Sequence, residues 1–171
     1  PVDEKILSLL ETERYQVYIK AFEEMVTFVD DQRNPTGINK YCRDYALSHG
    51  HLNFRKEMRK DKLTDELKEV EVVDPIHPYT PDDPEERVIV IIDNASNLAN
   101  ESGMKKMETI DKMSKYGITL RNQLSFIFVL IQHQAQAQEG IENMKLNKLK
   151  PSSDGLADCK TTTRDANMVI G

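Results

Sequence analysis

Two uninterrupted runs of branched and aromatic side chains predict the most deeply buried strands of the chain. Residues 87–92, RVIVII, show no polar alternation, which is typical of a strand covered on both faces in a parallel sheet. Residues 125–132, SFIFVLIQ, form a second run of this kind. The alternating, β-branched stretch EVEVV at residues 69–73 predicts a further strand, and NMVIG at residues 167–171 predicts the start of another.

Apolar side chains spaced by three and four residues predict helices elsewhere. The spacing favours one or two amphipathic helices over residues 1–33 and another over residues 36–48. A methionine-rich stripe over residues 101–124 predicts a further helix, with one break near Gly117. Residues 54–69 interleave basic and acidic side chains, so we interpret them as a solvated helix face rather than as a binding patch.

The order of these elements predicts an α/β fold. Strand, helix, strand and loop alternate over residues 69–171, and right-handed crossovers would place the strands side by side and parallel. Residues 1–68 are expected to be mainly helical, and the proline-rich, acidic residues 74–86 to form a surface loop. We therefore expect one partial domain over residues 1–171, with a mainly parallel sheet flanked by helices and incomplete at both ends.

Composition and charge narrow the classes of protein that fit. The 171 residues are 39% hydrophobic and 30% charged, and no apolar run reaches the roughly 20 residues that a membrane-spanning helix needs. The formal net charge of -6 argues against a globally basic nucleic-acid-binding protein, so any contact with DNA would be local. Cys42 and Cys159 form no CxxC pair, which predicts reduced, packed thiols and a cytoplasmic setting.

Two polar side chains follow the predicted buried strands at their carboxyl ends. Asp93 comes directly after residues 87–92, in the pattern of a Walker B strand, whose aspartate helps to bind Mg²⁺ beside nucleotide phosphates. The alternative is an aspartate that caps the next turn, together with Asn94 and Ser96. Gln132 ends the second strand, where a neutral amide could sense a γ-phosphate or could simply begin a glutamine-rich loop. Because ligands bind where parallel strands end, we expect Asp93 and Gln132 to lie together.

The segment GLADCKTTTRDANMVIG, residues 155–171, adds a third feature. It contains the order D-x-x-x-x-x-x-D-A-[DN] followed by apolar residues, and it comes after Asp93, after Gln132 and after a basic loop. In this order of features, residues 87–171 resemble the RecA-like ATPase core of DnaB-type replicative helicases.

The resemblance implies an ATP-dependent DNA helicase motor that works between the subunits of a hexamer and moves along single-stranded DNA. Asp93 would bind Mg²⁺ through water, and Gln132 would act in catalysis by reporting the state of the ATP γ-phosphate. Lys160 and Arg164 would face a neighbouring subunit.

A basic loop occupies the place where helicases of this family contact single-stranded DNA. Residues 139–155 form this loop, and it carries Lys145, Lys148 and Lys150. Lysines on such a loop suit contact with phosphates regardless of base sequence, and the alternative is an ordinary solvated loop. No aromatic residue lies among them, so base stacking is not indicated.

The chain also departs from the family pattern. Asn94 stands where an aromatic residue often follows the Walker B aspartate, and His133 begins a stretch without the family's usual Asn-Arg pair. No GxxxxGK[ST] sequence is present, so the glycine amides and the lysine that wrap a triphosphate are missing from these residues. We therefore expect the 171 residues to be the middle of a larger ATPase and to show no ATP turnover on their own.

The alternatives to a helicase motor are a non-catalytic RecA-like module for assembly or loading, and another ATPase of the superfamily, such as a recombinase or a packaging motor.

Overall fold

The computed structural model describes residues 4–133, 145, 156, 159 and 161–170. The chain divides into two compact units, residues 1–31 and residues 32–171. The described part of the first unit contains α1 (Glu4–Leu10) and α2 (Glu13–Met25), as the spacing of apolar residues predicts. α2 has no buried residue, and its apolar side chains Val17, Phe22 and Met25 are exposed.

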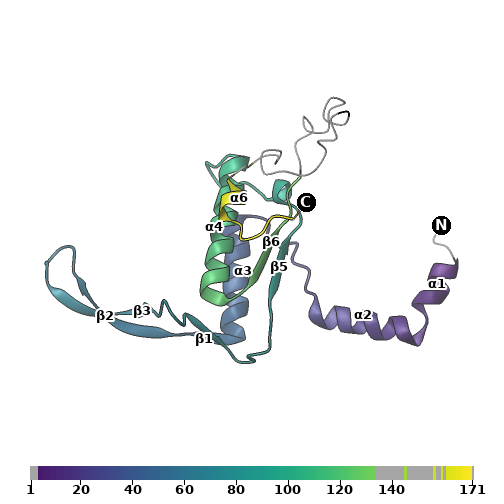
Figure 1. The fold of residues 1–171 in the computed structure, drawn as a ribbon, viewed down its shortest axis with the longest axis horizontal. Coiled ribbons are helices and arrows are strands. Elements are labelled where there is room, and N and C mark those ends of the chain that lie inside the picture. Colours follow the sequence, from purple (N-terminus) through teal and green to yellow (C-terminus); the bar gives the residue numbers. More distant parts are fainter. Residues whose placement is uncertain (1–3, 134–144, 146–155, 157–158, 160, 171) are drawn as a thin grey trace. The chain divides into compact units, whose positions relative to one another are not determined.

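The second unit combines helices with short strand pairs (Figure 1). Its elements, in chain order, are α3 (Pro35–Ser48), β1 (Gly50–Leu52), β2 (Phe54–Lys60), β3 (Leu67–Val73), β4 (Tyr79–Pro81), β5 (Ile89–Ile92), the 3-10 helix η1 (Ala95–Asn97), α4 (Lys106–Leu124), β6 (Ile127–Leu130) and α6 (Thr162–Asp165). β5 pairs with β6 in parallel, whereas β1 pairs with β4 and β2 with β3 in antiparallel orientation. The fold is mixed α/β, as predicted, but only one of the three strand pairs in the described residues is parallel.

Local sequence signals fix the ends of the two long helices. Asn34 caps α3, because its Oδ1 accepts a hydrogen bond from the backbone N of Gly37 at 2.8 Å, and Pro35 follows in the first turn. α4 runs through Gly117 without the predicted break and ends at Leu124, after which Ser125 adopts the left-handed conformation with φ 59°. None of the helices in the described ranges is both long and apolar enough to cross a bilayer.

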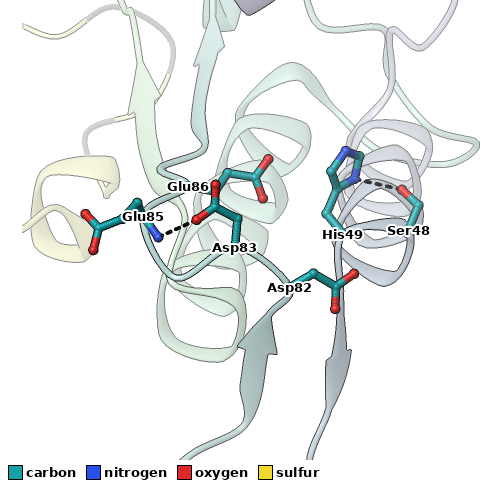
Figure 2. A pocket seen from close by; sticks show the side chains of 6 residues that line it. All are labelled: Ser48, His49, Asp82, Asp83, Glu85 and Glu86. Atoms are coloured by element: carbon teal, nitrogen blue, oxygen red, sulfur yellow. Dashed lines mark hydrogen bonds between the residues drawn. The ribbon is translucent and has the colours of Figure 1, made fainter.

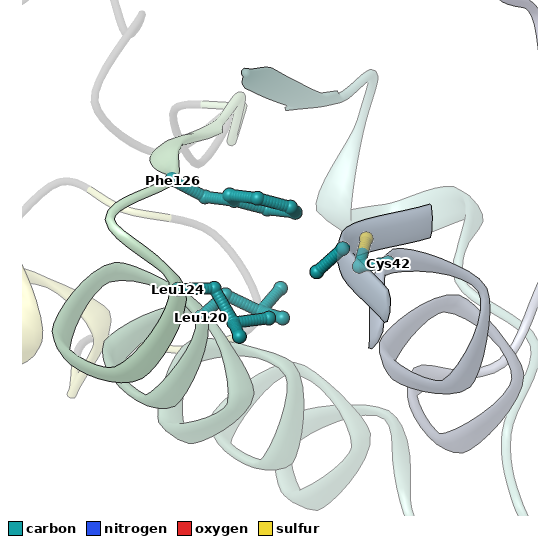
Figure 3. Packing of buried hydrophobic residues seen from close by; sticks show 5 residues of the cluster. Cys42, Leu120, Leu124 and Phe126 are labelled. Atoms are coloured by element: carbon teal, nitrogen blue, oxygen red, sulfur yellow. The ribbon is translucent and has the colours of Figure 1, made fainter. Parts of the chain in front are cut away.

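α3 and α4 pack on one face of the β5–β6 pair. One core cluster contains Cys42 and Ala46 of α3, Leu120 and Leu124 of α4, and Phe126 (Figure 3). A second cluster lies toward the carboxyl ends of the strands and contains Ala95, Leu98, Ile110, Met113 and Cys159. Both cysteines are free thiols inside these clusters, as predicted, and burial raises the pKa of Cys42 to about 11.

The opposite face of the β5–β6 pair is open in the described part of the chain. Ile89, Ile91 and Ile127 are 57%, 60% and 48% exposed, whereas Val90 and Phe128 point to the other face and pack against the core. Successive side chains of a strand point to opposite faces, and α3 and α4 cover only one of them. The expectation of a strand covered on both faces is therefore wrong for the described residues.

Residues 54–69 form most of an antiparallel hairpin, so the predicted solvated helix is wrong. Asp61 builds the turn between β2 and β3, because its carboxylate accepts hydrogen bonds from the backbone N of Leu63 at 2.9 Å and of Thr64 at 3.4 Å. The predicted strand at residues 69–73 is confirmed as the second part of β3. Pairing with this β-branched strand outweighs the helix propensity of the Arg, Lys and Glu residues in β2.

Two shorter segments also differ from the predictions. The proline-rich residues 74–86 include β4, and the hydroxyl of Tyr79 in this strand donates a hydrogen bond to the carbonyl of Ala46 in α3 at 2.9 Å. Residues 167–170 belong to no strand, although the apolar run predicted that one would begin there. Asn167, the first residue of this stretch, instead accepts a hydrogen bond from Arg121 of α4.

Glu101 joins the two long helices through its carboxylate. It accepts a hydrogen bond from the backbone N of Thr36 at 2.8 Å and another from the ammonium group of Lys112 in α4. The bond from Lys112, followed by those from Thr36, holds the pKa of Glu101 below its ordinary value. The same bond raises the pKa of Lys112.

We expect Glu101→Gln to unfold at a lower urea concentration than the wild type near pH 7. A carboxyl group whose pKa is lowered by folding stabilises the fold above its unfolded pKa of about 4.3, and this contribution is lost as pH falls through the lower folded pKa. The difference between Glu101→Gln and the wild type should therefore shrink from about pH 4 downward. Urea denaturation followed by circular dichroism, at pH 7 and below about pH 4, measures the difference in unfolding between the variant and the wild type. A difference of equal size at the two pH values would contradict a role for the charge of Glu101.

Candidate functional site

The predicted strand tips lie at one edge of the β5–β6 pair. The two strands run in parallel and end at the same level. Their pairing continues beyond Ile92, because the backbone N of Ile131 donates to the Ile92 carbonyl at 3.0 Å and the backbone N of Ala95 donates to the Ile131 carbonyl at 2.8 Å. Asp93 and Gln132 therefore follow adjacent parallel strands, as expected.

Asn94, and not Asp93, caps the turn that follows β5. The Oδ1 atom of Asn94 accepts a hydrogen bond from the backbone N of Ser96 at 2.9 Å, at the start of η1. The Asp93 side chain is exposed, and within the described ranges it has no hydrogen bond or ion pair. The capping role thus belongs to Asn94 and leaves the Asp93 carboxylate open to solvent.

The side-chain amide of Gln132 is used inside the structure. Its Nε2 donates a hydrogen bond to the carbonyl of Cys159 at 2.8 Å, and its Oε1 accepts one from the hydroxyl of Thr162 at 2.9 Å. Both Cys159 and Thr162 are buried. The amide therefore ties the end of β6 to the segment that leads into α6.

Asp93 and Gln132 belong to opposite sides of the sheet. Exposure alternates along β5, and Asp93 continues the open side on which Ile91 lies. Exposure alternates along β6 as well, and the half-buried Gln132 continues the covered side with Leu130. The expectation that the two side chains lie together is therefore wrong, although the two strands end at one edge. The carboxylate of Asp93 is open to solvent, whereas the amide of Gln132 is engaged on the other side of the sheet.

The Asp165-Ala166-Asn167 segment is anchored to α4. The carboxylate of Asp165 accepts a hydrogen bond from the hydroxyl of Ser114 at 2.9 Å, and the amide oxygen of Asn167 accepts one from the guanidinium of Arg121. Ser114 is buried, so the bond that it donates to Asp165 satisfies a hydroxyl that water does not reach freely. The acid and the amide of this segment hold the C-terminal part of the described chain against the helix.

The candidate cationic residues are only partly described. Lys148, Lys150 and Lys160 lie outside the described residues. Lys145 and Arg164 are described, and both side chains are exposed. Exposure suits contact with an anion, such as a phosphate group, but does not select one.

Two depressions in the described surface lie apart from Asp93 and Gln132. One, of about 360 Å³, is lined by Ser48, His49, Asp82, Asp83, Glu85 and Glu86 (Figure 2). The other, of about 460 Å³, lies beside the first turns of α4. The described residues contain no group of three or more His, Cys, Asp or Glu side chains that could hold a metal ion. A metal ion at Asp93 would therefore need phosphate oxygens and water as its other ligands.

Comparison with known proteins adds nothing to the geometry of the strand ends. The chain matches no protein-family model, no curated protein and no solved structure. Sequence reasoning located Asp93 and Gln132, but it missed the bonds of Gln132 and a further bond of 2.8 Å between Asn94 and His133. These contacts join residues that are 27, 30 and 39 positions apart, so no local spacing pattern reveals them.

Proposed function

We propose that the chain is part of an ATP-dependent motor like that of DnaB-type replicative helicases, in which a RecA-like core couples ATP hydrolysis to movement along single-stranded DNA. The observation that carries this proposal is the open Asp93 carboxylate at the end of β5, with Gln132 at the end of the adjacent parallel strand. Ligands of α/β proteins bind at this edge of the sheet. The motor would act as a homo-oligomer, a hexamer, with ATP bound between subunits.

The strand tips fit a magnesium–nucleotide complex by the chemistry of their donors. Mg²⁺ prefers oxygen ligands and usually keeps several waters beside one or two carboxylates and substrate phosphates. Asp93 offers one carboxylate for such contact through water, and no side chain of the described residues competes for it. Gln132 would read the γ-phosphate after its amide leaves Cys159 and Thr162.

The bonds of Gln132 support a second candidate function, a non-catalytic RecA-like module for assembly or loading. An amide that donates to a backbone carbonyl and accepts from a buried hydroxyl acts as a structural tie. The sequence also contains no P-loop to hold a triphosphate. In this function the residues at the strand ends would only stabilise the fold, and Asp93 would bind no ligand.

A recombinase or a packaging motor would bind its nucleotide at the same edge of the sheet. An assay of strand separation on a forked DNA duplex distinguishes a helicase from both.

We expect Mn²⁺·ATP, used in place of Mg²⁺·ATP, to bind at the strand tips with a dissociation constant on the order of a millimolar, because P-loop contacts are missing. Bound Mn²⁺ broadens the NMR signals of nearby backbone amides, and the broadening should centre on residues 93–96 and 131–133. Asp93→Ala should weaken binding at least about tenfold, because within the described residues this carboxylate is the group that the arrangement offers to the metal, through water. No ATP hydrolysis is expected from the 171 residues.

Asp44→Ala provides a matched control, because Asp44 is an exposed acid on α3. This variant should bind Mn²⁺·ATP like the wild type. Broadening that centres elsewhere, or that is equal in Asp93→Ala and Asp44→Ala, would contradict the motor and favour the non-catalytic module. Hydrolysis that depends on Asp93 would contradict the expectation that these residues are inactive alone.

A further inference from the structure

A polar bridge joins the two strand tips at the residues that directly follow Asp93 and Gln132. The Nδ2 atom of Asn94 lies 2.8 Å from Nε2 of His133. Both residues are among the positions at which the sequence departs from the helicase-like pattern. These two residues contact each other in the structure.

The turn after β5 decides which way the Asn94 amide points. The backbone N of Ser96 can only donate, so the side-chain atom that lies 2.9 Å from it is the oxygen, Oδ1. The Nδ2 group therefore faces His133, and it too can only donate. Nε2 of His133 must accept, which requires a neutral imidazole with its hydrogen on Nδ1.

The bridge attaches the Asp93 backbone to β6 at a second point. Ala95 is fully buried, and its backbone N already bonds the carbonyl of Ile131 at 2.8 Å. The bond between Asn94 and His133 lies one residue nearer to Asp93. Because the Asp93 side chain has no bond of its own in the described residues, the position of its carboxylate depends on this backbone.

We propose that His133 is a positioning residue that acts through Asn94 to hold the Asp93 carboxylate where it meets a metal–nucleotide complex. This inference rests on the nucleotide site proposed above. A carboxylate on an unattached turn must be ordered when the ligand binds, and that ordering weakens affinity. The bond from Asn94 to His133 orders the turn beforehand, so part of this loss is avoided.

The variants His133→Leu and His133→Gln show whether the hydrogen bond to Asn94 matters or only the space that the His133 side chain fills. Leucine fills space but accepts no hydrogen bond, whereas the Oε1 atom of glutamine can accept from Nδ2 of Asn94. We expect His133→Leu to weaken Mn²⁺·ATP binding about three- to tenfold, the range of one net hydrogen bond, and His133→Gln to bind within about twofold of the wild type. Binding of ATP without metal should not change in either variant, because His133 acts only through the metal-binding carboxylate.

The double variant Asp93→Ala/His133→Leu completes the test. If His133 acts through Asp93, the double variant binds no more weakly than Asp93→Ala, because the group being positioned is already gone. The positioning role is overturned if His133→Leu binds like the wild type, if His133→Gln binds no better than His133→Leu, or if the losses of the two single variants add. In each of these cases a loss in Asp93→Ala still supports the nucleotide site. No loss in Asp93→Ala would overturn both proposals. Thermal unfolding shows whether each variant is folded.

Discussion

Gly117→Leu should lower the free energy of unfolding by about 3 kcal/mol, at the upper end of the range for overpacking a core. Gly117 is buried in α4, and a β-carbon at this position would come within 3.0 Å of Cγ, Cδ1 and Cε1 of Phe128 in β6. Because Cγ is the base of the ring, rotation of the ring does not remove the overlap. The helix must move away from the sheet, or Phe128 must leave the core. Urea denaturation followed by circular dichroism measures the loss.

Asn122→Leu is the matched control for this prediction, because it places leucine at an exposed position of the same helix. Its effect should stay within about 0.5 kcal/mol. A double-mutant cycle with Gly117→Ala and Phe128→Leu should show a coupling energy of at least about 1 kcal/mol, since the smaller side chain at position 128 makes room for the new methyl group. Equal stability of Gly117→Leu and Asn122→Leu would contradict the packing of α4 on β6.

The same glycine shows which part of the fold the sequence can predict. Apolar spacing located α4, but it also suggested a break near Gly117, because glycine lowers helix propensity. The reason for a glycine at this position is the close approach of Phe128, a contact between elements that local spacing does not contain. The aliphatic runs located β5 and β6 because such side chains need burial, but they did not reveal that only one face is covered.

The hairpin of β2 and β3 illustrates a stronger conflict between local and tertiary signals. The residues of β2 have side chains that favour a helix when taken alone. Their strand conformation depends on pairing with β3 and on the turn that Asp61 stabilises, and a count of apolar positions along the chain registers neither of these contacts. Strand propensity is set by such neighbours more than by the residues themselves, so this element was not predictable from its own sequence.

The candidate site, like the fold, could be predicted from the sequence only in part. The placement of Asp93 and Gln132 followed from the rule that parallel strands present their carboxyl ends at one edge, and the structure has that placement. The contacts around them join groups that are far apart along the chain: the Asn94 amide with the His133 ring, and the Gln132 amide with the backbone carbonyl of Cys159. A single sequence can therefore predict which residues lie at the edge of the sheet. It cannot predict which polar groups bond to each other there, because those partners are brought together by the packing of distant segments.

Gln132→Ala should lower the free energy of unfolding by about 2 kcal/mol, because two polar groups of buried residues each lose a hydrogen-bond partner and keep only each other. The carbonyl of Cys159 would lose its donor at 2.8 Å, and the hydroxyl of Thr162 would lose the acceptor at 2.9 Å. Thr162 still lies 3.1 Å from the Cys159 carbonyl, so part of the network remains. Urea denaturation gives the global effect. Hydrogen exchange at residues 161–166 should rise by about tenfold or more if the segment is released.

The variants Gln132→Glu and Thr162→Val measure separately how much each of the two hydrogen bonds of the Gln132 amide contributes to stability. The glutamate keeps the acceptor for Thr162 but turns the donor toward Cys159 into a second acceptor, so it should destabilise at least as much as Gln132→Ala near pH 7. Thr162→Val removes only the hydroxyl and should cost about 1 kcal/mol. If Gln132→Ala unfolds like the wild type, the amide does not tie β6 to the C-terminal segment. A large loss would also bear on the proposed motor: a nucleotide that drew Gln132 away would have to supply that free energy through its own contacts, since a ligand shifts an equilibrium only by its differential affinity.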